Sequence, residues 1–307
     1  MLKRTIARVT PLIVALAATL AGCGSDGEGS ATSTKPLKVM SFNVLCSFCD
    51  RTFDPWEQRL AYFGDIFRRH DPDLIGLQEL SPPPFNNGME VQQVLAKAPG
   101  YAAIYFIPEA GTAYVPYPDA TILYRTSRFT VVDHGQYWLS PTPDTPLSIG
   151  FARLQFARLV VWARLRDNAN DGRELYFATT HFDNNSPSQE KSAPLVEERT
   201  APVVAQEPVI VVGDFNSRPD STAYGILTTD TNQGFVFKNS FDFVGYHIVT
   251  NQTPLPSYDT TDRIDHIFLA GKDVHWTVTD WLADLTVYGP NHKFPSDHFP
   301  IVAVIAY

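Results

Sequence analysis

Two polar side chains follow an apolar, β-branched run at residues 209–212. Gly213 ends the run, and Asp214 and Asn216 come next, one residue apart. Four apolar residues in a row predict a strand buried on both faces, and residues i and i+2 of an extended chain point to the same side. A carboxylate and a carboxamide would then face one pocket, where the first can accept a proton from water and the second can donate hydrogen bonds to an oxyanion. Asp and Asn also favour an Asx-type turn, so both interpretations stay open.

Polar residues stand at the ends of further strand-like runs. They are Asn43, Glu79, His181, Asp265, and Asp297 with His298. Asn43 and Glu79 end two strands joined by a helix, so both are expected at one rim of a sheet. Each residue also has an ordinary explanation. His181 could be a core histidine, for example, and Asp265 could pair with Arg263.

Most of the remaining chain has strand-like patterns, with few helices between them. Apolar residues at helical spacing within 56–70 predict a helix, with Asp54 as its N-cap and Pro55 in its first turn. The other predicted strands are 101–106, 121–124, 130–139, 156–166 and 175–182, and short helices are predicted at 90–98 and 195–199. No repeat or second linker interrupts residues 37–307, so we expect one α/β domain of two facing sheets with helices outside.

The first 22 residues have the features of a signal peptide. A basic start precedes an apolar run at residues 11–21 that is too short to span a membrane. The ending Leu-Ala-Gly-Cys at 20–23 resembles the bacterial lipobox, which implies lipidation at Cys23; the alternative is an ordinary secretory signal. Residues 23–36 are rich in Gly, Ser and Thr, which predicts a flexible tether. We therefore expect an exported protein held by lipid on the periplasmic or cell-surface side of a bacterial membrane.

Charge and cysteine content restrict the partners and the compartment. The formal net charge is −9, and removal of residues 1–22 takes away three positive charges and no negative ones, which leaves −12. This argues against broad nucleic-acid binding, although a bound divalent cation would still permit a phosphorylated substrate. Cys46 and Cys49 remain after Cys23, and export favours a disulfide between them over a redox or zinc motif; a free pair is the alternative.

The polar strand ends, taken in order, resemble the endonuclease/exonuclease/phosphatase superfamily of deoxyribonuclease-I-like, metal-dependent phosphoesterases. The resemblance extends from Ser41 to His298 and rests on six short motifs. They are Ser-Phe-Asn-Val (41–44), Leu-Gln-Glu (77–79), Thr-His-Phe-Asp (180–183), Gly-Asp-Phe-Asn (213–216), Arg-Ile-Asp-His (263–266) and Ser-Asp-His (296–298). The resemblance implies a four-layer α/β sandwich, in which two mixed β-sheets pack face to face with helices outside.

The resemblance also implies a bound Mg2+ or Mn2+. Glu79 would be its main carboxylate ligand, with Asn43 in support and Asp297 as a further ligand; few direct carboxylates suit Mg2+, which keeps part of its water shell. One position departs from the DNA-repair branch, which has an acid two residues after the first Asn. Leu45 stands there in this chain, which weakens the case for an abasic-site nuclease and for a second metal.

The remaining motif residues receive catalytic roles from the same resemblance. Asp214 would orient or deprotonate the attacking water, and Asn216 and His181 would donate hydrogen bonds to phosphate oxygens. Asp265 would hold His298 in one tautomer. Arg158, which precedes an apolar run, is either a phosphate contact or half of a salt bridge at a strand edge.

The sequence leaves the substrate open. A phosphorylated small molecule, a phospholipid head group and extracellular nucleic acid all fit a metal-dependent phosphoesterase, which we expect to be a monomer. A sphingomyelinase-like hydrolase would favour an exposed aromatic hairpin, for which Tyr101–Tyr117 is the candidate; Tyr114 and Tyr117 there either line the substrate site or pack on each other. A catalytically silent lipoprotein that binds phosphate-bearing ligands is the alternative outside enzymes.

Overall fold

The computed structural model describes residues 34–81, 90–151 and 156–307, and the compact unit runs from Thr34 to Tyr307. The signal peptide, Cys23 and most of the predicted tether lie outside the described residues. The last residues of that tether contact the domain, because the Lys35 amide donates a hydrogen bond to Asn170 Oδ1 at 2.6 Å and Arg128 donates to the Lys35 and Pro36 carbonyls.

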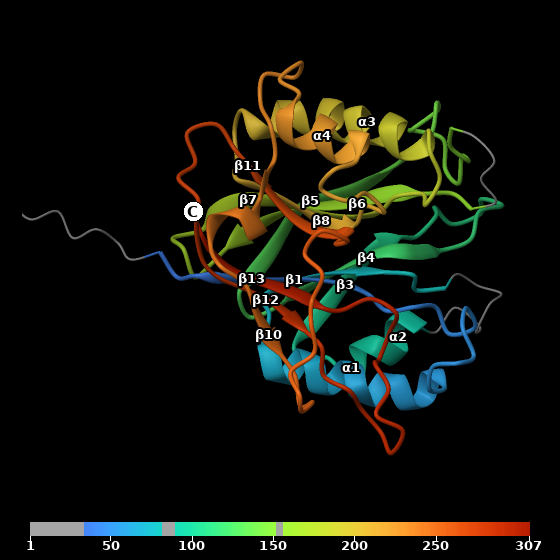
Figure 1. Ribbon diagram of the computed structural model, residues 1–307. Helices are drawn as coiled ribbons and strands as arrows, with labels where there is room; N and C mark the ends of the chain where they lie inside the picture. Colours follow the sequence, from blue (N-terminus) through green and yellow to red (C-terminus); the bar gives the residue numbers. More distant parts are fainter. Residues whose placement is uncertain (1–33, 82–89, 152–155) are drawn as a thin grey trace, which may run out of the picture. The chain divides into compact units, whose positions relative to one another are not determined.

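Two mixed β-sheets form the centre of the unit, as predicted (Figure 1). The seven-stranded sheet has the order β10 (His247–Val249), β12 (Thr277–Asp284), β13 (Ile301–Ala306), β1 (Leu37–Asn43), β2 (Leu74–Gln78), β4 (Tyr117–Arg125) and β3 (Tyr101–Phe106). The six-stranded sheet has the order β5 (Phe129–Trp138), β6 (Leu159–Asp167), β7 (Arg173–His181), β8 (Val209–Asp214), β11 (Asp265–Ala270) and β9 (Lys238–Asn239). The β1–β2, β10–β12 and β7–β8 pairs are parallel, and the other pairs are antiparallel.

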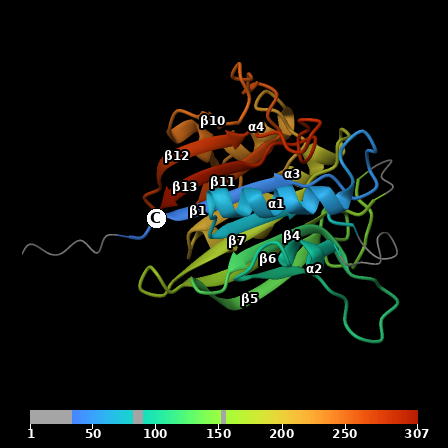
Figure 2. The same ribbon diagram turned by 90° about the horizontal axis from the view of Figure 1, so that it is seen from below.

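Helices cover the outer face of each sheet (Figures 1 and 2). α1 (Trp56–His70) and α2 (Glu90–Leu95) pack on the seven-stranded sheet, and α3 (Ser188–Val204) and α4 (Thr222–Thr229) pack on the six-stranded sheet. A short 3-10 helix, η2 (Ser240–Phe243), follows β9. Within the described residues, no helix is both long enough and apolar enough to cross a membrane.

The start of α1 differs from the expectation. Pro55 is the N-cap, and Asp54 makes no capping hydrogen bond. The Asp54 carboxylate instead accepts a hydrogen bond from the Tyr62 hydroxyl at 2.9 Å and lies 3.7 Å from Lys293 Nζ. The prediction that Asp54 caps the helix was therefore wrong, because tertiary partners hold its side chain.

Alternating side chains explain why the central strands are largely apolar. In β8, Ile210 and Val212 belong to the cluster between the sheets, whereas Val209 and Val211 belong to the cluster under α3 and α4. In β1, Val39 lies in the cluster between the sheets and Phe42 packs with α1. A strand covered on both faces has no polar side in its interior, so polar groups collect where the strand ends.

Two glycines allow the close approach that brings these strand ends together. A Cβ on Gly76 of β2 would lie 2.3 Å from Val212 Cγ2 of the opposite sheet, and a Cβ on Gly213 would lie 2.1 Å from the Thr180 carbonyl oxygen. Neither site has room for a side chain. The Asn43 side chain at the end of β1 consequently reaches the Asp214 carboxylate at the end of β8, with 3.1 Å between Nδ2 and Oδ2.

Candidate active site

Strand register places three of the predicted residues side by side. Asp214 is the last residue of β8, and its Cα is paired with that of His181 in β7 and with that of Asp265 in β11. His298 approaches from the loop before β13. Its backbone amide donates a hydrogen bond to Ser296 Oγ at 3.1 Å, and Ser296 Oγ donates to the Asn43 carbonyl at 2.8 Å, which ties this loop to the end of β1.

His298 and Asp265 form a buried pair next to Asp214. His298 Nδ1 lies 2.8 Å from Asp265 Oδ2, and His298 Nε2 lies 3.6 Å from Asp214 Oδ2. Burial lowers the pKa of His298, but the Asp265 and Asp214 carboxylates outweigh it and raise the pKa to about 10. The imidazole is therefore held protonated, with one N–H directed at Asp265 and the other toward Asp214. Arg263, the alternative partner of Asp265, lies 3.7 Å from Asp242 instead.

His181 contacts Asp214 from the opposite side. Its Nε2 lies 3.5 Å from Asp214 Oδ2, and its Nδ1 lies 3.1 Å from Asp119 Oδ1. Arg158 donates to Asp119 Oδ2 at 3.0 Å, and its Nη1 lies 2.7 Å from His181 Nδ1. Burial by itself would raise the pKa of the Asp119 carboxyl. The neighbouring His181 and Arg158 outweigh burial and lower this pKa to about 2. Arg158 is thus part of a salt bridge inside the site rather than at a strand edge.

Asp119 is a site residue that the sequence interpretation missed. Its Oδ1 lies 3.1 Å from His181 Nδ1, a nitrogen that Arg158 also contacts, so Asp214 lies between two histidines that each have a second carboxylate as a neighbour. Asp119 lies within β4, between Pro118 and Ala120, and matches none of the six motifs. The strand was predicted only from residue 121, which left Asp119 outside it, so no local pattern marked this residue.

Asn216 does not share the direction of Asp214. β8 ends at Asp214, and Asn216 has a left-handed backbone with φ of 47°. Its amide donates to Asp214 Oδ1 at 2.9 Å, which is an Asx turn, and its Nδ2 donates to the Phe182 carbonyl at 3.0 Å. The inference from an extended i and i+2 pair was therefore wrong, because the strand has already ended. A contact of Asn216 with phosphate stays a prediction.

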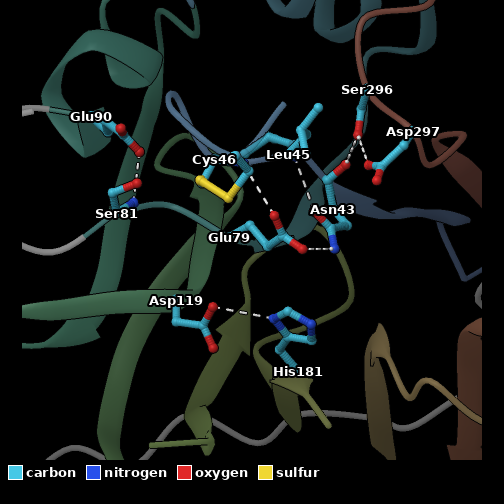
Figure 3. The surroundings of a disulfide bond; sticks show 12 residues. Asn43, Leu45, Cys46, Glu79, Ser81, Glu90, Asp119, His181, Ser296 and Asp297 are labelled. Carbon is cyan, nitrogen blue, oxygen red and sulfur yellow. Dashed lines mark hydrogen bonds and ion pairs between the residues drawn. A yellow bond between two sulfur atoms is a disulfide. The ribbon is translucent and has the colours of Figure 1, made fainter. Parts of the chain in front are cut away.

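Glu79 occupies the position expected for a metal carboxylate, directly after β2. Its Oε1 accepts a hydrogen bond from Asn43 Nδ2 at 2.9 Å, and its Oε2 accepts one from the Cys46 amide at 3.1 Å (Figure 3). Asn43 Oδ1 accepts from the Leu45 amide at 3.0 Å. Asn43 therefore supports Glu79 through its N–H group.

Asp297 is exposed beside this group, and its Oδ1 lies 3.2 Å from Ser296 Oγ (Figure 3). Within the described part of the chain, neither Glu79 nor Asp297 forms a salt bridge with a lysine or arginine. Each oxygen of Glu79 keeps a lone pair beyond the hydrogen bond it accepts. Carboxylate oxygens left without a cationic partner suit a hard divalent cation, so these residues fit Mg2+ or Mn2+.

The structure contains a disulfide between Cys46 and Cys49, with 5.2 Å between their Cα atoms. A pocket of about 250 Å³ lies beside it. The pocket is lined by Cys46, Phe48, Cys49, Glu79, Leu80, Ser81, Tyr117, Asp119, Phe156, Arg158 and His181. Tyr117 thus lines the site, whereas Tyr114 is 41% exposed and absent from the lining. A second pocket of about 250 Å³ opens beside Asp265, Asp297 and His298.

Comparison with known proteins agrees with this geometry. The family model described as Endonuclease/Exonuclease/phosphatase family matches residues 40–298, a range that includes every polar strand end described above. The chain belongs to this family. Its members are phosphoester hydrolases, and they typically use divalent metals.

Solved members of the family share the fold over most of their length. An endonuclease/exonuclease/phosphatase from Bacteroides vulgatus is 25% identical, with a TM-score of 0.71 over 89% of this chain and 99% of its own. A mannosyl-6-phosphatase from Bacteroides thetaiotaomicron is 26% identical, with a TM-score of 0.71 over 88% of this chain and 100% of its own.

A curated relative comes from a fungus. The CCR4-Not complex 3'-5'-exoribonuclease subunit Ccr4 of Emericella nidulans is 23% identical over 90% of this chain and 53% of its own length. The chain therefore spans about half the length of this relative.

Proposed function

We propose that the protein is an exported, lipid-anchored phosphoesterase that depends on Mg2+ or Mn2+. The observation that carries this proposal is the arrangement around Asp214, whose carboxylate lies within 3.6 Å of His181, His298 and Asn43 nitrogens. Asn43 also binds Glu79, so the proposed metal carboxylate and the proposed base share one hydrogen-bonded residue. A silent ligand-binding protein would not require a buried carboxylate between two oriented histidines.

Each residue has a role that follows from its contacts. Glu79 would hold the cation with Asp297, and Asn43 would orient Glu79. Asp214 accepts hydrogen bonds and can take the proton of the attacking water. The protonated His298, held by Asp265, can donate a hydrogen bond to a phosphate oxygen, and His181 can donate from the other side. When bound, the divalent cation would neutralise charge that develops on the phosphate oxygens.

Charge and pocket size favour a small phosphate ester over a nucleic-acid polymer. A formal net charge of −9, or −12 without residues 1–22, repels a polyanion at long range. The pocket of about 250 Å³ beside Glu79 can take a compact organic group, and the exposed Phe48 and Phe156 line it. Among the relatives, the mannosyl-6-phosphatase has a small substrate by its name. Extracellular nucleic acid is the less favoured substrate.

A phospholipid head group is a second candidate substrate. The β3–β4 connection extends away from the sheet and exposes Ile107, Tyr114 and Val115, which are 63%, 41% and 41% accessible (Figure 2). Exposed apolar side chains on one connection can enter a lipid surface. A sphingomyelinase-like role would use this connection to reach lipid from an anchored position.

An activity screen of residues 34–307 tests both candidates. Purified protein would be assayed with Mg2+ or Mn2+ on sugar phosphates, nucleotides, short oligonucleotides and sphingomyelin vesicles. We expect turnover of a small ester that is abolished by a chelator and strongly reduced in Glu79→Gln, with the fold intact by circular dichroism. Hydrolysis of vesicles that is lost in an Ile107→Ser, Val115→Ser variant would favour the second candidate. Binding of esters without turnover, with either metal, would overturn the enzymatic proposal.

A further inference from the structure

The Glu79 carboxylate is fixed by two N–H groups from one short segment. Asn43 Nδ2 holds Oε1 at 2.9 Å, and the Cys46 amide holds Oε2 at 3.1 Å. Because the two donors bind different oxygens, they set the rotation of the carboxylate plane. Figure 3 shows both contacts and the disulfide next to them.

The backbone on both sides of these contacts is strained. Leu45 and Glu79 have φ angles of 54° and 69°, a left-handed region that non-glycine residues rarely adopt. Such a conformation is unfavourable for a non-glycine residue and persists only where its surroundings enforce it. An element that enforces this conformation therefore also controls the direction of the Glu79 carboxylate.

Two elements hold the segment 44–46, and they act on different groups. The buried Arg59 side chain donates to the carbonyls of Val44 at 2.6 Å, Leu45 at 2.9 Å and Cys46 at 3.0 Å. The disulfide restrains the Cys46 side chain instead and ties it to Cys49, where the chain has become exposed. Arg59 would keep the segment folded without the disulfide. On the exposed side, the Cys49 amide donates a hydrogen bond to the Cys46 carbonyl at 3.4 Å, and the disulfide adds a covalent link to the Cys46 side chain.

We propose that the Cys46–Cys49 disulfide is a positioning element for Glu79 and makes metal binding depend on its oxidation. It acts through the Cys46 amide, which sets the carboxylate plane, and touches no reacting atom. This inference rests on the proposed function, because it assumes that Glu79 holds the cation. Groups that orient a metal ligand typically change metal affinity or activity 10–100-fold when removed.

Reduction of the unmodified protein is the direct test. A dithiol transfers two electrons and two protons to the disulfide, which gives two thiols and the cyclic disulfide of the reductant. After the dithiol is removed without air, Mg2+ would be titrated by calorimetry. We expect the dissociation constant to rise about tenfold or more, the Cys46 amide to exchange faster by NMR, and reoxidation to restore both. An unchanged dissociation constant with free thiols would overturn the proposal.

The Cys46→Ser, Cys49→Ser double variant is the matched control. It should bind Mg2+ as the reduced protein does and show no response to dithiol. The sulfur atoms of Cys46 and Cys49 and a carboxylate oxygen of Glu79 lie within 4.8 Å of one another. The reduced thiols could therefore bind trace zinc. Serine does not form such a site. If the reduced protein loses Mg2+ affinity and the serine variant does not, zinc bound to the thiols explains the loss, and the proposal that the disulfide positions Glu79 is refuted.

A double-mutant cycle shows whether the effect passes through Glu79. If the disulfide acts only by orienting this carboxylate, its removal should change Mg2+ affinity in the normal chain and much less in Glu79→Gln. Equal changes in both backgrounds would mean that the disulfide merely stabilises the fold. Wild-type protein that binds no Mg2+ would defeat the proposed function, whereas tight binding unaffected by reduction would defeat this inference alone.

Discussion

Asp214 lies between two histidines, and each histidine has its own carboxylate. For His298, the partner is Asp265 at 2.8 Å. His298→Ala should lower kcat by a factor on the order of 10²–10⁴, the range for a positioned acid–base group, and leave KM largely unchanged. Asp265→Asn should lower kcat in the same direction. The double variant should lose much less than the product of the two losses, because Asp265 acts through His298.

Steady-state kinetics on the ester found by the screen would measure these losses. His247→Ala is the control, because His247 is a surface histidine that also pairs with an acid, Asp280, at 3.1 Å. Near-normal turnover of His298→Ala, or two losses that multiply independently, would show that the pair is not a catalytic unit.

The candidate site residues were predictable to different degrees. Motifs identify residues at strand ends, and for Asp214, His298 and Glu79 the structure brings the motif residues together at one site. Asp119 belongs to no motif, and it joins the site only because β4 of one sheet faces β7 of the other. Asn216 was expected beside Asp214, but a turn begins one residue after the strand ends. Local pattern cannot state where a strand ends to within one residue.

At the scale of elements, β2 and β8 approach each other closely at Gly76. A residue with a side chain would not fit at this position. Gly76→Ala would place a Cβ 2.3 Å from Val212 Cγ2 and 2.5 Å from Thr179 Oγ1. We expect a loss of about 1–3 kcal/mol in the free energy of unfolding, typical of overpacking. Gly225→Ala in α4 is the control, because its Cβ meets nothing within 4 Å, and it should stabilise by about 0.5–1 kcal/mol. Urea denaturation would show whether the two changes have opposite signs.

α3 carries a buried acid, Glu197, against the six-stranded sheet. Burial, with a smaller contribution from Asp230, raises its pKa from 4.5 to about 7. The folded protein thus keeps a proton that the unfolded chain releases. The contribution of Glu197 to stability is full below pH 4.5 and falls as the pH rises toward 7.

In the Glu197→Gln variant the side chain at this position cannot ionise. The free energy of unfolding of this variant, relative to that of the normal chain, should therefore increase between pH 5 and pH 8. The neighbouring Glu198 is exposed, and Glu198→Gln should leave the pH dependence unchanged. Urea denaturation at the two pH values would decide this. Parallel stability curves for Glu197→Gln and the normal chain would contradict the shifted pKa.

Element prediction failed where tertiary contacts override local pattern. α3 extends from Ser188 to Val204 and contains Pro194 and Pro202, so its sequence predicted only a short helical piece. β12 includes Asp284, which is buried because His70 and Arg69 bind it at 2.7 Å and 2.8 Å. Asp284 ends β12, and Asp280 interrupts the apolar pattern inside it, so a hydrophobicity pattern does not reveal this strand. By contrast, the apolar run of β8 was clear, because both of its faces are covered.

At the scale of the whole molecule, negative charge and a lipid anchor would act together. The acidic domain should be repelled by polyanions, and a tether would keep it near a membrane where small esters diffuse to it. The sequence predicts both features without the structure, since net charge and a lipobox need no tertiary contacts. The proposed substrate pocket could not be predicted in this way, because residues as distant in the sequence as Phe48 and Phe156 line it.

The final prediction concerns the proposed anchor at Cys23. The Leu-Ala-Gly-Cys ending follows a short apolar run, and a diacylated cysteine gives the two chains that stable membrane attachment requires. Cys23→Ser should therefore move the protein from the membrane fraction to the soluble fraction, or leave it unprocessed. The Cys46→Ser, Cys49→Ser variant should remain in the membrane fraction, because its anchor is intact. Mass spectrometry of the mature N-terminal peptide would detect the lipid on Cys23. Equal membrane recovery of Cys23→Ser and the normal chain, with an unmodified N-terminal peptide, would indicate that Cys23 carries no anchor.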